Sequence, residues 1–122
     1  MAENKQYITK VQDNGSIMIS EDVVASIVAQ SVQEVEGVVG LSVKPGADIA
    51  DIIGKKNWGK GMRIVIAEDN SLTIDCDILI CYGQSVVAVA QNVQETISGH
   101  LESMTGVKVS SVNVNVCGIS RQ

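Results

Sequence analysis

The sequence predicts an α+β domain of two layers, in which a mixed sheet of about five strands carries two main helices on one face. The chain holds 19 Val and 14 Ile against four Leu and no Phe. Because β-branched side chains favour strands, a sheet should supply much of the core. Two longer stretches instead repeat their apolar residues with the period of a helix. At 122 residues the chain is long enough for one such domain.

The N-terminal part is polar until the first alternating segment. Residues 1–12 are expected to be a flexible N-terminal segment, and residues 13–119 to form the single domain. Within residues 15–20, Ile17 and Ile19 alternate with polar or small neighbours. This alternation predicts a short strand.

The first helix is expected to start after Ser20 and to run to about Glu36. Serine is a good N-cap, and the two acidic residues that follow suit the positive end of the helix dipole. Gly37 is a suitable stop. The positions that share one helical face are Val24, Ile27, Val28, Ser31 and Val35.

A second strand is expected over residues 38–43, and the Pro45-Gly46 pair should end it. Residues 48–53 can then form one or two helical turns. The sequence therefore predicts the element order β-α-β-(short α)-β-β-α-β once the second half is added.

The second half begins with a predicted β-hairpin. Residues 62–67 and 72–80 both alternate, and the polar run 68–71 between them has the composition of a turn. The core face of the hairpin is expected to carry Met62, Ile64, Ile66, Leu72, Ile74, Cys76, Ile78 and Ile80.

The second helix and the last strand follow. The helix should begin near residues 84–85 and end at residues 105–106, and the strand should run from Val107 with a bulge near residues 110–111, where the apolar phase shifts. The apolar stripe of the helix consists of Val86, Ala90, Val93, Ile97, Leu101 and Met104.

The basic segment 55–63 is the first candidate site. It carries a formal charge of +4, whereas the other residues hold five Lys or Arg against fourteen Asp or Glu. Such a patch can meet a phosphate, a lipid head group or an acidic partner. A solvated loop whose lysines only maintain solubility is the alternative. The candidate residues are Lys55, Lys56, Trp58, Lys60 and Arg63.

The sheet face opposite the core is the second candidate site. Its predicted residues are partly apolar, so we expect another subunit or a partner to cover it, and we expect a homo-oligomer. The candidate residues for self-association are Val65, Ala67, Leu79 and Ile119.

Several function classes are disfavoured. A net charge of −5 argues against broad nucleic-acid binding. No apolar run is long enough to insert directly into a membrane, and the start of the chain lacks a signal peptide, so a cytoplasmic protein is expected. Its three cysteines would stay reduced there. Cys81 and Cys117 fall on the outer faces of their strands and could meet if those strands pair.

No catalytic, cofactor or metal site is predicted. His100 is the only histidine, so any nucleophile would have to use it, and spacing assembles no such pair. Cys76 and Cys81 are five apart on one strand, which places them on opposite faces. Asp75 and Asp77 share a face, but they alternate with core residues as in a solvated strand.

The order and spacing of several stretches resemble the alkaline-shock protein family, the envelope-stress response proteins of Gram-positive bacteria. The resemblance implies a non-catalytic interaction protein in cell-envelope homeostasis, associated with the membrane through an anchor protein or docked on a protein of fatty-acid metabolism. An anion- or nucleic-acid-binding regulatory module that uses residues 55–63 is the alternative. The stretches that carry the resemblance are residues 15–20, 34–41, 54–61, 78–83, 89–95, 105–107 and 112–118.

Overall fold

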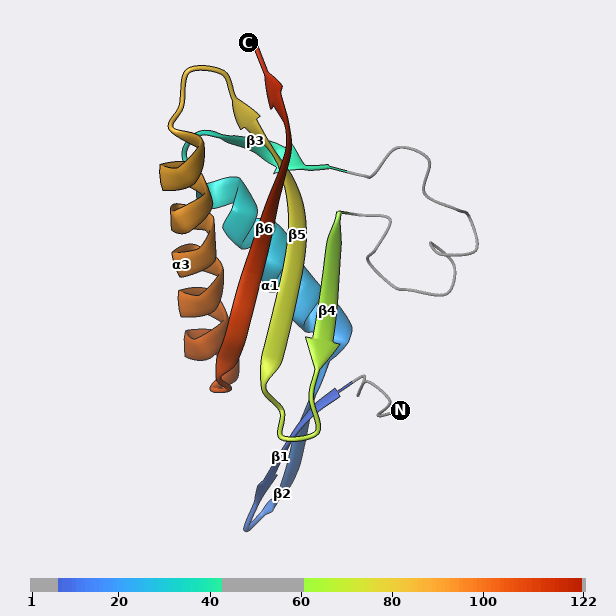
Figure 1. The fold of residues 1–122 in the computed structure, drawn as a ribbon. Coiled ribbons are helices and arrows are strands. Elements are labelled where there is room, and N and C mark those ends of the chain that lie inside the picture. The colour runs from blue at the N-terminus through green and yellow to red at the C-terminus, as the bar shows by residue number, and fades with distance from the viewer. Residues whose placement is uncertain (1–6, 43–60, 122) are drawn as a thin grey trace, which may run out of the picture.

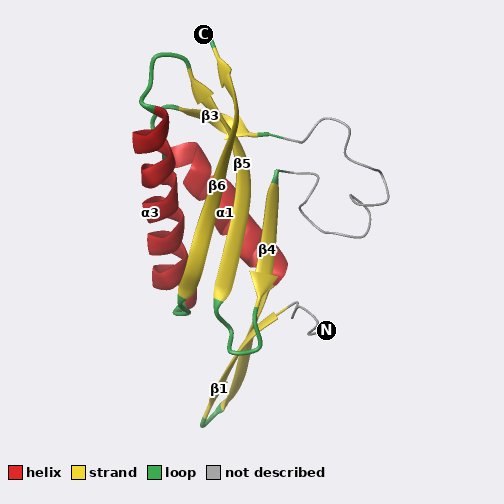
Figure 2. Ribbon diagram, in the orientation of Figure 1, coloured by secondary structure: helices red, strands yellow, loops and turns green. Residues whose placement is uncertain are grey.

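The computed structural model describes residues 7–42 and 61–121. Figures 1 and 2 show a long sheet with one helix crossing behind it and another along its side, and a separate hairpin below. The predicted helical turns at residues 48–53 lie outside the described residues. The elements are β1 (Tyr7–Gln12), β2 (Gly15–Ser20), α1 (Glu21–Glu34), β3 (Val38–Leu41), β4 (Met62–Ile66), β5 (Leu72–Cys81), α3 (Val86–Thr105) and β6 (Val109–Ser120).

The main sheet is built around β5. On one edge β5 pairs antiparallel with both β3 and β4, and on its other edge it pairs in parallel with β6. β3 pairs with the C-terminal half of β5, and β4 with the N-terminal half. The sheet is therefore mixed, as predicted, and β3 and β4 occupy the same edge one after the other.

The ends of β3 and β4 meet at one residue of β5. The N–H of Ser42 donates to the Asp77 carbonyl at 2.8 Å, and the N–H of Asp77 donates to the Gly61 carbonyl at 2.8 Å. Gly61 has φ = 84°, and a Cβ there would lie 2.5 Å from the Ser42 carbonyl oxygen. Only glycine fits this close approach of two backbones.

Both helices lie on the same face of the main sheet (Figure 2). α1 packs against β3 and β4, and α3 packs against β6 and α1. The connection from β5 through α3 to the parallel strand β6 is a crossover unit, which needs a helix of this kind. The predicted two-layer architecture is confirmed.

Two sequence predictions need correction at the N-terminus. Residues 7–12 are not a loose segment, because they form β1 and pair antiparallel with β2 from Tyr7↔Ser20 to Gln12↔Gly15. The main sheet has four of the six described strands rather than about five, because the predicted strand at residues 15–20 pairs with β1 in a sheet of its own. The polar composition hid β1, because Ile8 is its only buried residue.

The hairpin of β1 and β2 is held to the main sheet by a side chain in the β4–β5 turn. The Asn70 amide donates to the Thr9 carbonyl at 2.9 Å, and its Oδ1 accepts from the Thr9 N–H at 3.2 Å. The Asn70 side chain thus makes the same pair of hydrogen bonds with Thr9 that a residue of a neighbouring strand would make. Its φ of 72° is one that Asn tolerates better than most residues.

The helix caps follow the predicted chemistry. Ser20 caps α1, its Oγ accepting from the Asp22 N–H at 3.0 Å. The helix ends at Glu34, two residues earlier than expected. α3 ends on Gly106, which has φ = 74°.

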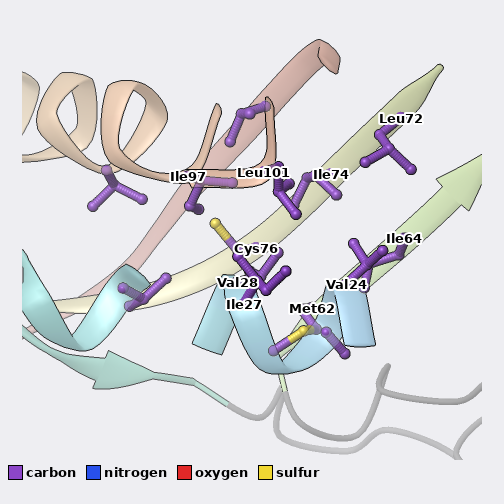
Figure 3. Close-up of a cluster of buried hydrophobic side chains, with 14 of the residues drawn as sticks. Val24, Ile27, Val28, Met62, Ile64, Leu72, Ile74, Cys76, Ile97 and Leu101 are labelled. Atoms are coloured by element: carbon purple, nitrogen blue, oxygen red, sulfur yellow. The ribbon is translucent and has the colours of Figure 1, made fainter. Parts of the chain in front are cut away.

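The core lies between the helices and the sheet, as the close-up in Figure 3 shows. It joins the apolar stripes of both helices to the alternate positions of β4 and β5. The side chains with no exposed surface include Val24, Val28, Val32, Ile66, Leu72, Ile74, Ile78, Ile80, Val93, Ile97 and Leu101. Val86 and Met104, which were predicted for the stripe of α3, are exposed instead.

β6 contains two register shifts. The first lies between the β5 positions Leu72 and Thr73 and confirms the bulge predicted near residues 110–111. The second lies between Ile78 and Leu79, and it inserts Cys117. It was missed because Cys117 and Gly118 give no alternation to follow.

Candidate functional site

Most of the basic segment lies outside the described residues, which include only Arg63 of its candidates. Arg63 is on β4, and its Nη2 lies 2.7 Å from Oδ2 of Asp75 on β5. The Nε of Arg63 contacts the same oxygen at 3.2 Å. Both nitrogens donate to the same carboxylate oxygen, so the exposed Arg63 side chain forms an ion pair between β4 and β5. Lys55, Lys56, Trp58 and Lys60 stay predictions.

The face of the main sheet opposite the helices is the best-defined surface of the molecule. None of the described helices or strands covers it, as Figure 1 shows. Its middle is made by the odd-numbered residues of β5 and their register neighbours. We call this the outer face, and it comprises Arg63, Val65, Thr73, Asp75, Asp77, Leu79, Ser111, Asn113 and Asn115.

The predicted self-association residues do not all share the outer face. Val65 and Leu79 lie there, and both are half-buried. Ala67 lies beyond the end of β4, in the turn, and is exposed. Ile119 pairs in register with Ile80 and so lies on the helix side, where 54% of it is exposed. The second bulge of β6 reverses its side.

Leu79 is the largest apolar side chain of the outer face. Gly118 of β6 makes room for it, because a Cβ at Gly118 would lie 3.0 Å from a Leu79 methyl carbon. The polar neighbours of Leu79 are also held in place. Asp77 is 8% exposed, and its Oδ1 accepts from the Asn115 amide at 2.9 Å. The outer face is thus an ordered surface whose polar middle lies between the apolar side chains of Val65 and Leu79.

The two helices bring together a serine, a histidine and a glutamate. His100 Nδ1 on α3 lies 2.8 Å from Ser31 Oγ on α1, and His100 Nε2 lies 3.7 Å from Glu34 Oε1. Spacing could not find this contact, because 69 residues separate Ser31 from His100.

This trio does not have the properties of a nucleophilic site. Ser31 has no exposed surface, and its hydroxyl donates to the Ile27 carbonyl at 2.7 Å. The single proton of the hydroxyl is therefore used within α1, and Oγ accepts from His100. A substrate cannot reach an oxygen in this position, so the trio joins the two helices.

The cysteines lie apart. Cys76 is in the core, and burial, with Asp77 and Asp75 nearby, raises the pKa of its thiol to about 12. Cys81 pairs in register with Ser120, whereas Cys117 occupies the bulge beside Leu79. The strands do pair, but their register does not bring Cys81 and Cys117 opposite one another, and all three thiols are free.

The described residues hold neither a cluster of metal ligands nor a helix suited to cross a membrane. Among residues 7–42 and 61–121, no group of three or more His, Cys, Asp or Glu side chains is arranged to hold a metal ion. None of the helices in this part of the chain combines the length and apolar character that a membrane crossing needs.

Comparison with known proteins gives the family. Residues 9–121 match the model of the alkaline-shock protein family, which has a cell envelope-related function. The protein Spy1614 of Streptococcus pyogenes is 33% identical over 108 residues, covering 87% of this chain and 88% of that protein. The protein YqhY of Bacillus subtilis is 31% identical over 105 residues, covering 86% and 77%.

A solved structure, MamM-CTD H264A, superimposes with a TM-score of 0.49 at 13% identity, covering 84% of this chain and 98% of that one. The family match extends from β1 to the end of β6, and so includes both helices and the whole main sheet. The chain therefore belongs to the alkaline-shock protein family, whose function is related to the cell envelope.

Proposed function

We propose that the chain is a non-catalytic interaction protein of the cell envelope, which docks a membrane-anchor or lipid-metabolism protein through its outer face. The observation that carries this proposal is the uncovered sheet face with the half-buried Leu79 on its central strand. Half-buried apolar residues beside a fixed polar network are typical of surfaces that bind another protein. The buried Ser31 supports a role without catalysis.

Recruitment to the membrane is then expected to need a protein. The chain is net acidic, so anionic lipid should repel it except at residues 55–63. The proposal can be tested by sedimenting the purified chain with membranes of Bacillus subtilis, with the same membranes after protease treatment, and with protein-free vesicles of their lipids. Binding to the untreated membranes alone supports it, and equal binding to all three contradicts it.

Leu79→Glu addresses the surface itself. A carboxylate in place of Leu79 should abolish membrane capture, because the partner would bury it without a counter-charge, and a buried unpaired charge is costly. Val23→Glu, a change at an exposed valine of α1, is the matched control and should leave capture intact. Replacing Lys55, Lys56 and Lys60 by Gln separates the alternative function. If that variant alone loses capture, the basic segment and not the outer face binds the partner.

Self-association is proposed for the same face. The wild-type chain should sediment as a dimer or larger at micromolar concentration, and Leu79→Glu should give a folded monomer. A wild-type monomer across that range would exclude the outer face as a self-association surface, without affecting the membrane test.

A further inference from the structure

The outer edge of β6 presents backbone groups that the sheet does not use. The N–H of Leu72 on β5 donates to the Lys108 carbonyl at 3.1 Å, whereas the N–H of Asp77 points to the opposite edge, toward Gly61. Backbone directions alternate along a strand, so the even-numbered residues of β5 face β6. In a parallel pair, the residue of β6 opposite each of these positions points its own N–H and C=O away from β5. The residues of β6 in this position include Val112, Val114 and Val116.

Side chains of α3 occupy only the first part of this edge. Glu102 Oε2 accepts from the Val109 N–H at 3.2 Å, and Gln94 Nε2 donates to the Val112 carbonyl at 2.9 Å. In the described part of the chain, the outward N–H and C=O groups of Val114 and Val116 have no such partner. The open length of edge therefore centres on Val114 and Val116.

Between its two bulges, the strand has no charged residue or proline that would protect its edge from pairing. Proteins protect exposed edge strands with Lys, Pro or inward charges, and also with bulges or a covering element. β6 carries no charged residue and no proline between Val109 and Ser120, and its run from Ser111 to Val116 is regular between two bulges. An uncharged, regular and β-branched edge of this kind accepts a further strand readily.

One flank of α3 lies along the same edge (Figure 1). Gln94 and Glu102 show which flank this is, because both reach the backbone of β6. Helical spacing adds Val87 and Ser98 to it. Val87 is 66% exposed, and Glu102 lies near the start of β6, so the flank is apolar at one end and acidic at the other.

The acidic charge of α3 favours a single extended segment over a second copy of the chain as the binding partner at this edge. A second copy that paired its own β6 with this edge would keep both helix layers on one side of the continued sheet. Two α3 helices would then meet, and α3 carries Glu95 and Glu102 but no Lys or Arg. A single extended segment brings no helix, and basic residues in it would face Glu102.

We propose that the edge of β6 and the adjoining flank of α3 bind an extended segment of a partner protein by strand addition. The segment carries β-branched residues opposite Val114 and Val116 and Lys or Arg at the end near Glu102. Backbone bonds supply the pairing, and the side chains select the sequence. This inference rests on the proposed interaction role, but it uses a surface separate from the outer face.

Amide hydrogen exchange can test the edge residue by residue. In the free protein, the amides of Asn113 and Asn115 should be protected by β5, and those of Val114 and Val116 should exchange fast. The probe is a synthetic peptide of alternating Val and Thr that ends in two Lys. Adding it should slow exchange at Val114 and Val116 at least about tenfold. No change at saturating peptide would overturn the proposal.

The same measurement distinguishes a second copy. If Val114 and Val116 are already protected in the free protein, and protection falls on dilution together with the sedimented mass, then a copy of the chain covers the edge and the proposal is wrong. The peptide in which Glu replaces both Lys should bind more weakly than the basic one. Equal affinity would exclude the role of Glu102.

Two variants complete the test. Val114→Pro removes the outward N–H without touching a bond to β5, and should weaken peptide binding at least about tenfold. Val114→Thr keeps the N–H and should bind within about twofold of wild type. Should Val114→Pro fail to fold, the exchange data still decide. Membrane capture that is lost in Leu79→Glu while peptide binding persists would show that the two surfaces act separately.

Discussion

Ser31 on α1 and His100 on α3 meet at 2.8 Å, and this hydrogen bond joins the two helices. The Ser31 hydroxyl donates its one hydrogen bond to the Ile27 carbonyl, so Oγ can only accept from His100. His100 therefore donates through Nδ1, which leaves Nε2 toward Glu34. The positions of Ser31 and His100 in the sequence do not suggest that they pair. Because Ser31 is buried, the hydrogen bond between them has a structural role.

The strength of this link can be measured by a double-mutant cycle. Ser31→Ala, His100→Ala and the double variant should give a coupling energy of about 1 kcal/mol in urea unfolding, because one buried hydrogen bond is lost in each single variant. The cycle of Glu34→Gln with His100→Ala should give less than about 0.5 kcal/mol, since both side chains are half-exposed and 3.7 Å apart. Equal couplings would contradict this assignment.

Cys76 should make the chain less stable in alkali. Its thiol pKa is about 12 in the folded protein against an ordinary value of 9.0. Between these values the unfolded chain releases the proton and the folded chain keeps it, so the free energy of unfolding falls as pH rises. The loss is about 1.4 kcal/mol for each pH unit. Below about pH 9 the contribution of the thiol is fully present.

Urea unfolding of wild type and Cys76→Ala from about pH 8 to 11 isolates this effect. Cys76→Ala leaves a small cavity and should be less stable at the low end of that range. The difference between the two proteins should shrink as pH rises, because only wild type loses stability through the thiol. A constant difference over the range would show that Cys76 does not titrate in this way.

Gly106, which ends α3 in the left-handed region, should be costly to replace. Its φ of 74° disfavours a side chain, and a Cβ there would meet the amino group of Lys10. Lys10 lies on β1, so its cation reaches the negative end of α3. Gly106→Ala should therefore cost about 1–2 kcal/mol in the free energy of unfolding.

Gly99→Ala is the matched control for Gly106→Ala. Gly99 lies inside α3, and nothing lies within 4 Å of a Cβ placed there. Alanine should therefore stabilise the chain by up to about 1 kcal/mol. Urea unfolding of both variants gives the comparison, and a destabilised Gly99→Ala would show an unseen constraint on α3.

Asn70→Ala should loosen the hairpin of β1 and β2 without unfolding the main sheet. The substitution removes both bonds to Thr9, and an isolated two-stranded hairpin is marginal in water. Faster amide exchange at Thr9 is expected, with unchanged exchange in β5. Asn70→Gly tolerates the same φ and tests the side chain alone. Slow exchange at Thr9 in both variants would mean that Ile8 holds the hairpin.

The parts predicted best are those with one clear period. The β4–β5 hairpin and both long helices could be placed from alternation and from helical spacing, since one face of each is buried. β1 could not, because its single buried residue, Ile8, makes no period. The side of Ile119 was wrong for a related reason. The bulge at Cys117 moves the side chains that follow it to the opposite face of the sheet. The residues around it are small or polar, so the sequence shows no break in apolar alternation that would reveal the bulge.

The candidate site was less predictable than the fold. The sequence places Val65 and Leu79 on a second face through strand alternation, and the structure agrees for both. The open edge of β6 and the contact of His100 with Ser31 depend on which strands and helices become neighbours. That information is tertiary, so no local pattern contains it. The residues 55–60 of the basic segment lie outside the described part and stay a prediction.

The two bonds at Asp77 have a consequence for how this fold can vary. Because Ser42 and Gly61 both attach to that one residue, the chain leaves the sheet and returns to it at the same point. A longer connection between these two residues costs little free energy to close. Each doubling of the number of residues in a flexible loop adds only about 0.6 kcal/mol. Relatives can therefore diversify the length and chemistry of this insertion while every strand keeps its register.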